Sequence, residues 1–190
     1  MRLKDSCQIF ILLLFFLSCE ESLPPRIVPQ NSLEITEIIA NQEANGGGIF
    51  MAIKVIGVNR YADTFQDTVK VNGNIHIWWV RKPEIEANVP LDNRHFKDPT
   101  RISGSVLTLD PGEEFHLETL WYLKADDGKN IIDLLDFSNS PVIDGIVTAA
   151  PEKFVLEVQL TLFNETGLLR SKPHEFIITG WKVAETTPPE

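Results

Sequence analysis

The feature that most constrains the fold is an alternation of apolar and polar residues that recurs along the chain. Residues 154–163 read FVLEVQLTLF, so that every second side chain from Phe154 to Leu162 is apolar and shares one face. A period of two residues is typical of a β-strand with one buried face, whereas an α-helix would need a period of 3.6. Similar alternation, or a short continuous apolar run, predicts strands at 32–39, 49–58, 68–80, 103–109, 115–123, 154–163 and 175–183.

Residues 68–80, TVKVNGNIHIWWV, are the most informative of these ranges. Val69, Val71, Ile75, Ile77 and Trp79 fall on one face, and Lys70, Asn72, Asn74, His76 and Trp78 fall on the other. A tight hairpin at Asn72-Gly73 is the competing interpretation. We favour one long strand, because the alternation passes through Gly73 without a slip, and we expect Gly73 to mark a bulge or a close backbone approach.

The connections between these ranges carry turn and loop signals. Residues 41–48 are expected to be a loop, and residues 82–101 a long polar excursion that covers Trp78. Asp110–Glu113 and Asp126–Gly128 predict tight turns. Residues 130–137 fit either a helical turn or a strand, and a short strand is expected within 142–147. With no strong amphipathic helix, the pattern predicts an all-β domain at 32–184, an antiparallel β-sandwich of seven or eight strands.

Residues 109–130, LDPGEEFHLETLWYLKADDGKN, carry a resemblance. An L-x-P-G-E turn, a strand ending in Trp and a D-x-G turn together resemble the late hairpin of immunoglobulin-like and fibronectin III-like bacterial envelope domains. The resemblance implies an immunoglobulin-like sandwich. It implies no functional residues, and the paired cysteines of antibody domains are absent.

The N-terminus reads as an export signal. Arg2 and Lys4 precede the apolar run Ile9–Leu17, which is too short to cross a bilayer. The following residues, Phe16-Leu17-Ser18-Cys19, resemble the lipobox of bacterial lipoproteins, in which the cysteine is acylated and residues 1–18 are removed. The alternative is an ordinary signal peptide cut after Ser18. We favour lipidation, because the one cysteine after the apolar run lies where a lipobox requires it.

Four segments follow from this interpretation: a signal peptide at 1–18, a proline-containing tether at 19–31, the sandwich at 32–184 and a polar tail at 185–190. The expected location is the bacterial cell envelope, on the outer membrane and on either its periplasmic or its surface face. The acidic pair Glu20-Glu21 resembles signals for the surface face. Cys19 would be the only cysteine of the mature chain, so no internal disulfide is expected.

A net charge of −10 argues against nucleic acid as a partner, because nucleic-acid binding needs a basic surface. The acidic cluster Asp126, Asp127, Asn130, Asp133 and Asp136 offers oxygens for Ca²⁺, but its spacing differs from that of an EF-hand loop. The four histidines, His76, His95, His116 and His174, lack the spacing of a zinc site. No G-x-S-x-G motif is present. We therefore expect no catalytic residue, metal or cofactor.

Trp78 is the side chain that most suggests binding. It shares the polar face of its predicted strand with His76 and Asn74. A flat apolar ring with hydrogen-bonding neighbours is what a glycan or a protein partner can dock on. The sequence thus predicts a non-enzymatic envelope lipoprotein, an accessory or assembly component that contacts a protein partner. The alternative is a carbohydrate-binding module built on Trp78, and a hydrolase or protease inhibitor with a site assembled across loops is a third interpretation.

Overall fold

A computed structural model describes residues 33–46, 48–97, 102–103, 106–162 and 168–184, with the side chains of 102–103 left out. The chain divides into two units, 1–30 and 31–190, and all described residues belong to the second. Within them the secondary structure is β-strand and short 3₁₀ turns, and every strand pair is antiparallel. The predicted antiparallel all-β class is confirmed.

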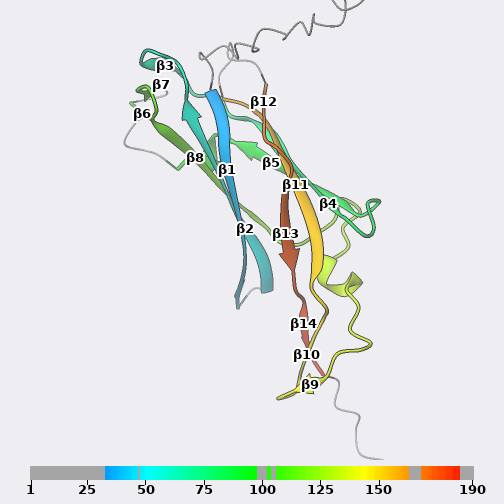
Figure 1. The fold of residues 1–190 in the computed structure, drawn as a ribbon. Helices are drawn as coiled ribbons and strands as arrows, with labels where there is room; N and C mark the ends of the chain where they lie inside the picture. The colour runs from blue at the N-terminus through cyan, green and yellow to red at the C-terminus, as the bar shows by residue number, and fades with distance from the viewer. Residues whose placement is uncertain (1–32, 47, 98–101, 104–105, 163–167, 185–190) are drawn as a thin grey trace, which may run out of the picture. The chain divides into compact units, whose positions relative to one another are not determined.

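One large sheet has the order β1-β2-β8 (Figure 1). Its strands are β1 (Leu33–Asn45), β2 (Gly48–Asn59) and β8 (Glu114–Trp121). The near-continuous apolar run of β2 suits its central place, because Ile53 and Val55 are buried on the inner face and Ile56 is buried on the outer face.

The second large sheet has the order β12-β11-β4-β5, with β13 also paired to β11. Its strands are β4 (Asn72–Trp79), β5 (Glu86–Asp92), β11 (Glu152–Thr161), β12 (Leu169–Arg170) and β13 (His174–Ile178). A 3₁₀ turn, Asn93–His95, follows β5, and another, Ile131–Leu134, settles the ambiguous range 130–137 as a helical turn.

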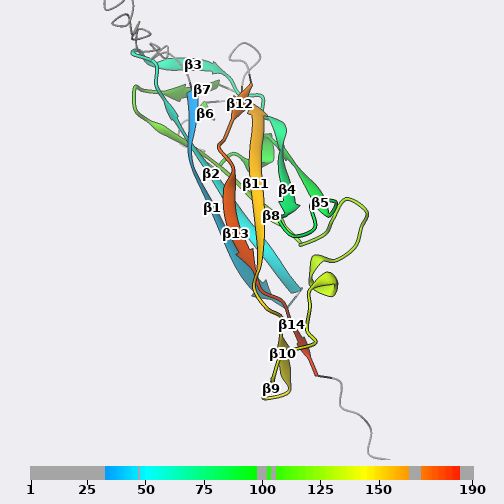
Figure 2. The ribbon, with the colours of Figure 1, turned by 45° about the vertical axis from the view of Figure 1, so that its right-hand side comes forward.

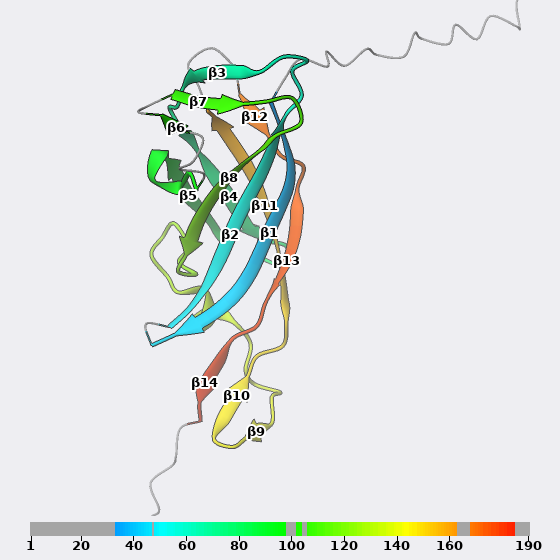
Figure 3. The ribbon, with the colours of Figure 1, turned by 90° about the vertical axis from the view of Figure 1, so that its left-hand side faces the viewer.

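Two small sheets lie at opposite ends of these strands (Figures 1 and 3). At one end, β3 (Phe65–Thr68), β7 (Val106–Leu109) and β6 (Ile102–Ser103) pair in that order. At the other, β14 (Trp181–Val183), β10 (Ile146–Thr148) and β9 (Val142–Ile143) form what we call the distal ribbon. Figure 2 shows the ribbon continuing the line of β11 and β13.

The core lies between the two large sheets and joins buried side chains of both. Its aromatic centre stacks Trp79 on Phe154 at 5.3 Å between ring centroids, with Trp121 and Phe176 packed edge-on to one another at 6.5 Å. The buried Trp79 indole donates to a Glu152 carboxylate oxygen at 2.9 Å, which satisfies its one polar atom. The inward faces predicted for 68–80, 115–123 and 154–163 are confirmed by this packing.

Several predicted boundaries are wrong. The loop expected at 41–48 is strand as far as Asn45. The single strand expected at 68–80 is interrupted at 69–71, because β3 pairs with β7 whereas β4 pairs with β11 and β5. The excursion expected at 82–101 contains β5, the edge strand beside β4. The range 175–183 divides into β13 and β14, which pair with different strands.

The number of strands also differs from the seven or eight that the sequence predicts. Fourteen strands occur in the described residues, of which seven have five or more residues and form the two large sheets. The hairpin expected within 109–130 is absent there: the Asp110–Glu113 turn forms as predicted, yet the strands that it joins, β7 and β8, lie in different sheets. The hairpin alternative at Asn72-Gly73 is likewise excluded, because β4 runs through both residues.

Candidate interaction surfaces

Asn74, His76 and Trp78 lie on the outer face of β4, as predicted. Their neighbours on β5 are Asn88 and Glu86. The His76 Nε2 atom lies 3.0 Å from a Glu86 carboxylate oxygen, and the His76 and Trp78 rings are 5.1 Å apart. The Asn74 amide donates to the Asn88 side-chain oxygen at 3.0 Å. The three predicted residues therefore share one continuous polar surface with two β5 residues.

Trp78 is half-buried on this surface. The described part of the expected excursion, residues 82–97, does not fold over it, because this part contains β5, which runs alongside β4. Instead Trp78 lies beside its β11 neighbour Val155, which is only 8% exposed although it faces away from the core. The indole thus offers part of its ring to a ligand.

Most of the acidic cluster considered for Ca²⁺ accepts hydrogen bonds from protein donors. Asp126 accepts the side-chain amide of Asn88 at 2.7 Å, and Asp127 accepts the Lys129 ammonium at 2.6 Å. The Lys129 hydrogen bonds lower the pKa of Asp127, and those from Ser138 lower the pKa of Asp136. Among the described residues no group of three or more histidine, cysteine, aspartate or glutamate side chains is arranged to hold a metal ion.

The four histidines stay apart. His76 and His116 each lie beside a glutamate, at 3.0 and 3.2 Å, and both are half-buried on outer sheet faces. His95 caps the turn after β5, and its Nδ1 atom accepts the Asp92 backbone N–H at 3.0 Å. His174 begins β13 and lines a cavity. These contacts are structural hydrogen bonds of exposed or partly exposed side chains.

The distal ribbon carries the most exposed apolar surface of the described residues, and its register explains why. Ile146 pairs with both Ile143 and Val183, and Thr148 pairs with Trp181. Paired residues point to the same face. Ile143 is 65% exposed, Val183 71%, Trp181 45% and Ile146 41%. We call these four side chains the ribbon face.

The sequence carries a signal for this ribbon, which has two short strands, β9 and β10, where one was expected within 142–147. Residues 142–147 read VIDGIV, and Asp144 and Gly145 adopt φ angles of +51° and +76°. Two consecutive positive φ angles are those of a type I′ turn, and Asp-Gly between apolar pairs is its sequence signature. This turn closes β9 on β10 and brings Ile143 beside Ile146.

The opposite face of the ribbon is covered only in part, because Val142 on that face is 60% exposed. Val147 is buried there, and a cavity of about 580 Å³ lies between the ribbon and the 3₁₀ turn that follows Asn130. The Lys182 ammonium lies 4.6 Å from the centre of the Phe137 ring in this cavity. Part of this face therefore packs against the domain, whereas the four side chains of the ribbon face are exposed.

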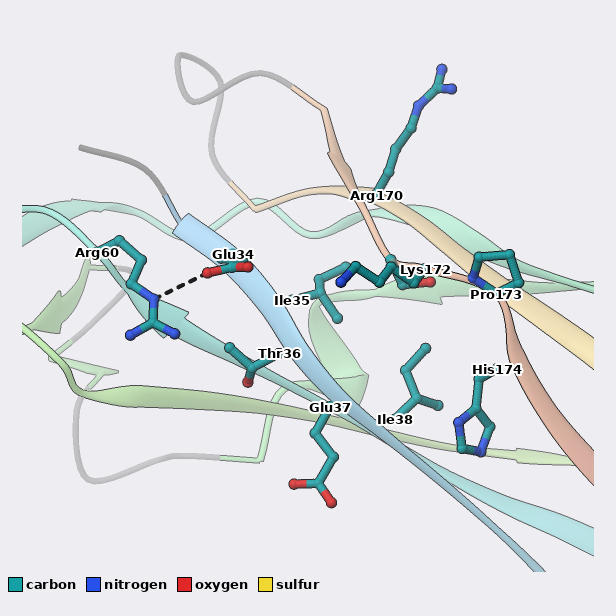
Figure 4. Close-up of a pocket in the computed structure, with 11 residues that line it drawn as sticks. Glu34, Ile35, Thr36, Glu37, Ile38, Arg60, Arg170, Lys172, Pro173 and His174 are labelled. Carbon is teal, nitrogen blue, oxygen red and sulfur yellow. Dashed lines mark hydrogen bonds and ion pairs between the residues drawn. The ribbon is translucent and has the colours of Figure 1, made fainter. Parts of the chain in front are cut away.

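A second cavity, of about 410 Å³, opens between β1 and the β12–β13 segment (Figure 4). Ile35 and Ile38 point from β1 toward Lys172, Pro173 and His174 (Figure 4). At one end of this cavity, the Arg60 guanidinium donates to Glu34 at 3.0 Å. A third hollow, of about 500 Å³, lies on the outer face of β1, β2 and β8. None of these three cavities is lined by Trp78.

Cys19, the predicted site of lipidation, lies outside the described residues. In the part of the chain that is described, no helix has the length and apolar character needed to cross a bilayer. No known protein family, curated protein or solved structure matches the chain.

Proposed function

We propose that this protein is a non-enzymatic lipoprotein of the bacterial envelope, anchored by lipid at Cys19, that serves as an accessory or assembly component through contact with a protein partner. The observation that carries this proposal is the ribbon face. Four apolar side chains on adjacent strands, each at least 41% exposed, form a patch of the kind that marks interaction sites.

The strand order supports an immunoglobulin-like sandwich as the scaffold. Seven strands have five or more residues, and they are numbered here in chain order. The first (β1), second (β2) and fifth (β8) form one sheet, and the fourth (β5), third (β4), sixth (β11) and seventh (β13) form the other. Immunoglobulin-type domains distribute their strands between two sheets in a similar way. The buried Trp79 on the third of these strands, stacked on Phe154 of the sixth, occupies a place like that of the core tryptophan of such domains.

The anchor and the ribbon face suit a role that reaches away from the membrane. β1 begins at the end of the sheets opposite the distal ribbon (Figures 1 and 3). A tether from Cys19 would join the domain at the start of β1, which lies at the opposite end of the sheets from the ribbon (Figures 1 and 3). A fully extended tether of 13 residues spans about 45 Å.

The partner that fits the ribbon face is a protein with an apolar strip bordered by basic side chains. The apolar strip would bury Ile143, Ile146, Trp181 and Val183, and the basic border would complement a chain of net charge −10 whose ribbon turn carries the exposed Asp144.

Site-specific photo-cross-linking in living cells tests this proposal. A photoreactive amino acid replaces Ile143, and a matched variant carries it at Ile177, an isoleucine that is 58% exposed on the outer face of β13. We expect one adduct of discrete mass from position 143, none from position 177, and loss of the adduct when Ile146 is replaced by Asp. Equal labelling at both positions, or none at 143, would refute the proposal.

A carbohydrate-binding module is the second candidate, and the outer face of β4 favours it. The partly exposed Trp78 ring is flanked by His76 and Asn74, whose partners Glu86 and Asn88 offer further hydrogen-bonding groups. The test is a glycan array with the wild-type protein and with Trp78→Ala. Binding that Trp78→Ala abolishes, with an unchanged circular dichroism spectrum, would establish this function, and unchanged binding would remove it.

A further inference from the structure

β1 and β13 are outer strands of the two large sheets, and a seam runs between them. At Gln42 the seam is closed by a side chain. The Gln42 amide donates to the Thr179 carbonyl at 2.5 Å and accepts the Thr179 N–H at 2.9 Å, in the manner of a backbone partner. This contact holds the two sheet edges together there.

Nearer the start of β1, the pairing of β1 and the pairing along β11 are both irregular, at positions that face each other, and the seam between the two sheets opens there. The register of β1 against β2 shifts between Ile35 and Glu37. Opposite it, the ladder along β11 is interrupted between β12 and β13, where the Ser171 hydroxyl accepts the Val158 N–H at 2.9 Å. Irregularities of this kind are common beside functional sites, and here two of them face each other across the 410 Å³ cavity.

The lining combines apolar side chains with basic side chains and an imidazole. Ile35 and Ile38 form one wall, and Lys172 and His174 face them from the other (Figure 4). Neither Lys172 nor His174 has an acidic partner among the described residues. Glu34 is engaged by Arg60 at 3.0 Å, and Glu37, which also lines the cavity, forms no ion pair with Lys172 or His174. The lining holds Arg60, Arg170 and Lys172 against Glu34 and Glu37, which is one positive charge in excess within a chain of net charge −10.

We propose that the seam cavity binds a small organic acid, with its carboxylate on Lys172 and His174 and its apolar body against Ile35 and Ile38. The cavity volume lies within the range of small-molecule sites. A carboxylate gains a charge-assisted contact from an ammonium group that otherwise faces water, and its apolar body covers side chains that otherwise border a void. This inference is independent of the function proposed for the ribbon face.

The test is an NMR titration of the ¹⁵N-labelled full-length protein with 3-phenylpropionate and with its neutral counterpart 3-phenylpropionamide. We expect saturable shifts of the amides of residues 35–38 and 171–174 with the acid, and binding of the amide weaker by about tenfold. Lys172→Gln should weaken acid binding by a similar factor. Lys70→Gln, which removes the same charge from an exposed lysine outside the cavity, should change the affinity less than about twofold.

Each contrary result overturns the inference. Equal affinity for the acid and the amide would exclude recognition of charge, and shifts confined to another surface would exclude this cavity. Acid binding that Lys172→Gln leaves intact, with an otherwise unchanged spectrum, would exclude the assigned contact. The ribbon-face proposal would be untouched by all three outcomes, because its test probes positions 143 and 177.

Discussion

At the scale of single residues, Gly73 shows how closely the two central strands of the second sheet approach. A Cβ atom at this position would meet the backbone oxygen of Gln159 and the Cβ of Leu160 on β11. The close approach expected from the sequence is therefore present, with no register shift between β4 and β11. Only glycine fits here without displacing the neighbouring backbone.

Gly73→Ala should destabilise the protein by about 1–3 kcal/mol, because the added methyl group must push β4 away from β11. Gly46→Ala is the matched control, since nothing lies within 4 Å of the Cβ it would add. Its effect should stay within about 0.5 kcal/mol. Urea unfolding followed by tryptophan fluorescence measures both, and equal stabilities of the two variants would show that the approach is looser than described.

The Asp92 carboxylate gives a prediction for acid pH. It caps the 3₁₀ turn after β5, and hydrogen bonds from the Arg94 side chain and backbone lower its pKa from 3.8 to about 2. Because the folded-state pKa is depressed, the contribution of this carboxylate to stability is complete above pH 3.8 and is lost as the pH falls toward 2.

A ¹³C NMR titration of the Asp92 carboxyl carbon should accordingly give a midpoint near 2, and Arg94→Ala should return it toward 3.8. The variant Arg60→Ala removes an arginine that pairs with Glu34 instead, and it should leave the Asp92 midpoint unchanged. A wild-type midpoint near 3.8 would contradict the assigned hydrogen bonds.

At the scale of elements, the β9–β10 turn decides whether the ribbon face exists. Gly145 has a φ of +76°, and the Ala184 N–H donates to its carbonyl at 2.8 Å. Gly145→Val should cost about 1–2 kcal/mol locally, because a β-branched residue is strained at positive φ. Faster amide hydrogen exchange at Val147 and Ala184, with β4 and β11 unchanged, is the expected result; unchanged exchange at both ribbon amides would show that the turn is not what orders the ribbon.

Elements also show what could be predicted from sequence. The inner faces of β4, β8 and β11 follow from alternation alone. β5 could also have been predicted, because Ala87, Val89 and Leu91 alternate with polar residues and Pro90, and an edge strand tolerates a proline. The division of 175–183 into β13 and β14 could not be predicted from the sequence. It depends on the pairing of β14 with β10, whose residues are over 30 positions away in the chain.

At the scale of the whole molecule, the antiparallel all-β class was predictable because most of the long strands keep one apolar face for a common core. The candidate surfaces were less predictable from the sequence. Alternation placed Asn74, His76 and Trp78 together, since they share one strand. The ribbon face and the seam cavity join residues from distant parts of the chain, and only the paired structure brings them side by side.

Hydroxyl-radical footprinting of the tryptophans tests the central claim most directly, because the ribbon face and the outer face of β4 each contain one tryptophan. Trp181 reports on the ribbon face and Trp78 on the outer face of β4, while the buried Trp79 and Trp121 serve as internal controls. Oxidation is read by mass spectrometry in the purified protein and in the native envelope. We predict protection of Trp181 in the envelope with Trp78 unchanged. Equal oxidation of Trp181 in both preparations would contradict the account, and protection of Trp78 alone would favour glycan binding instead.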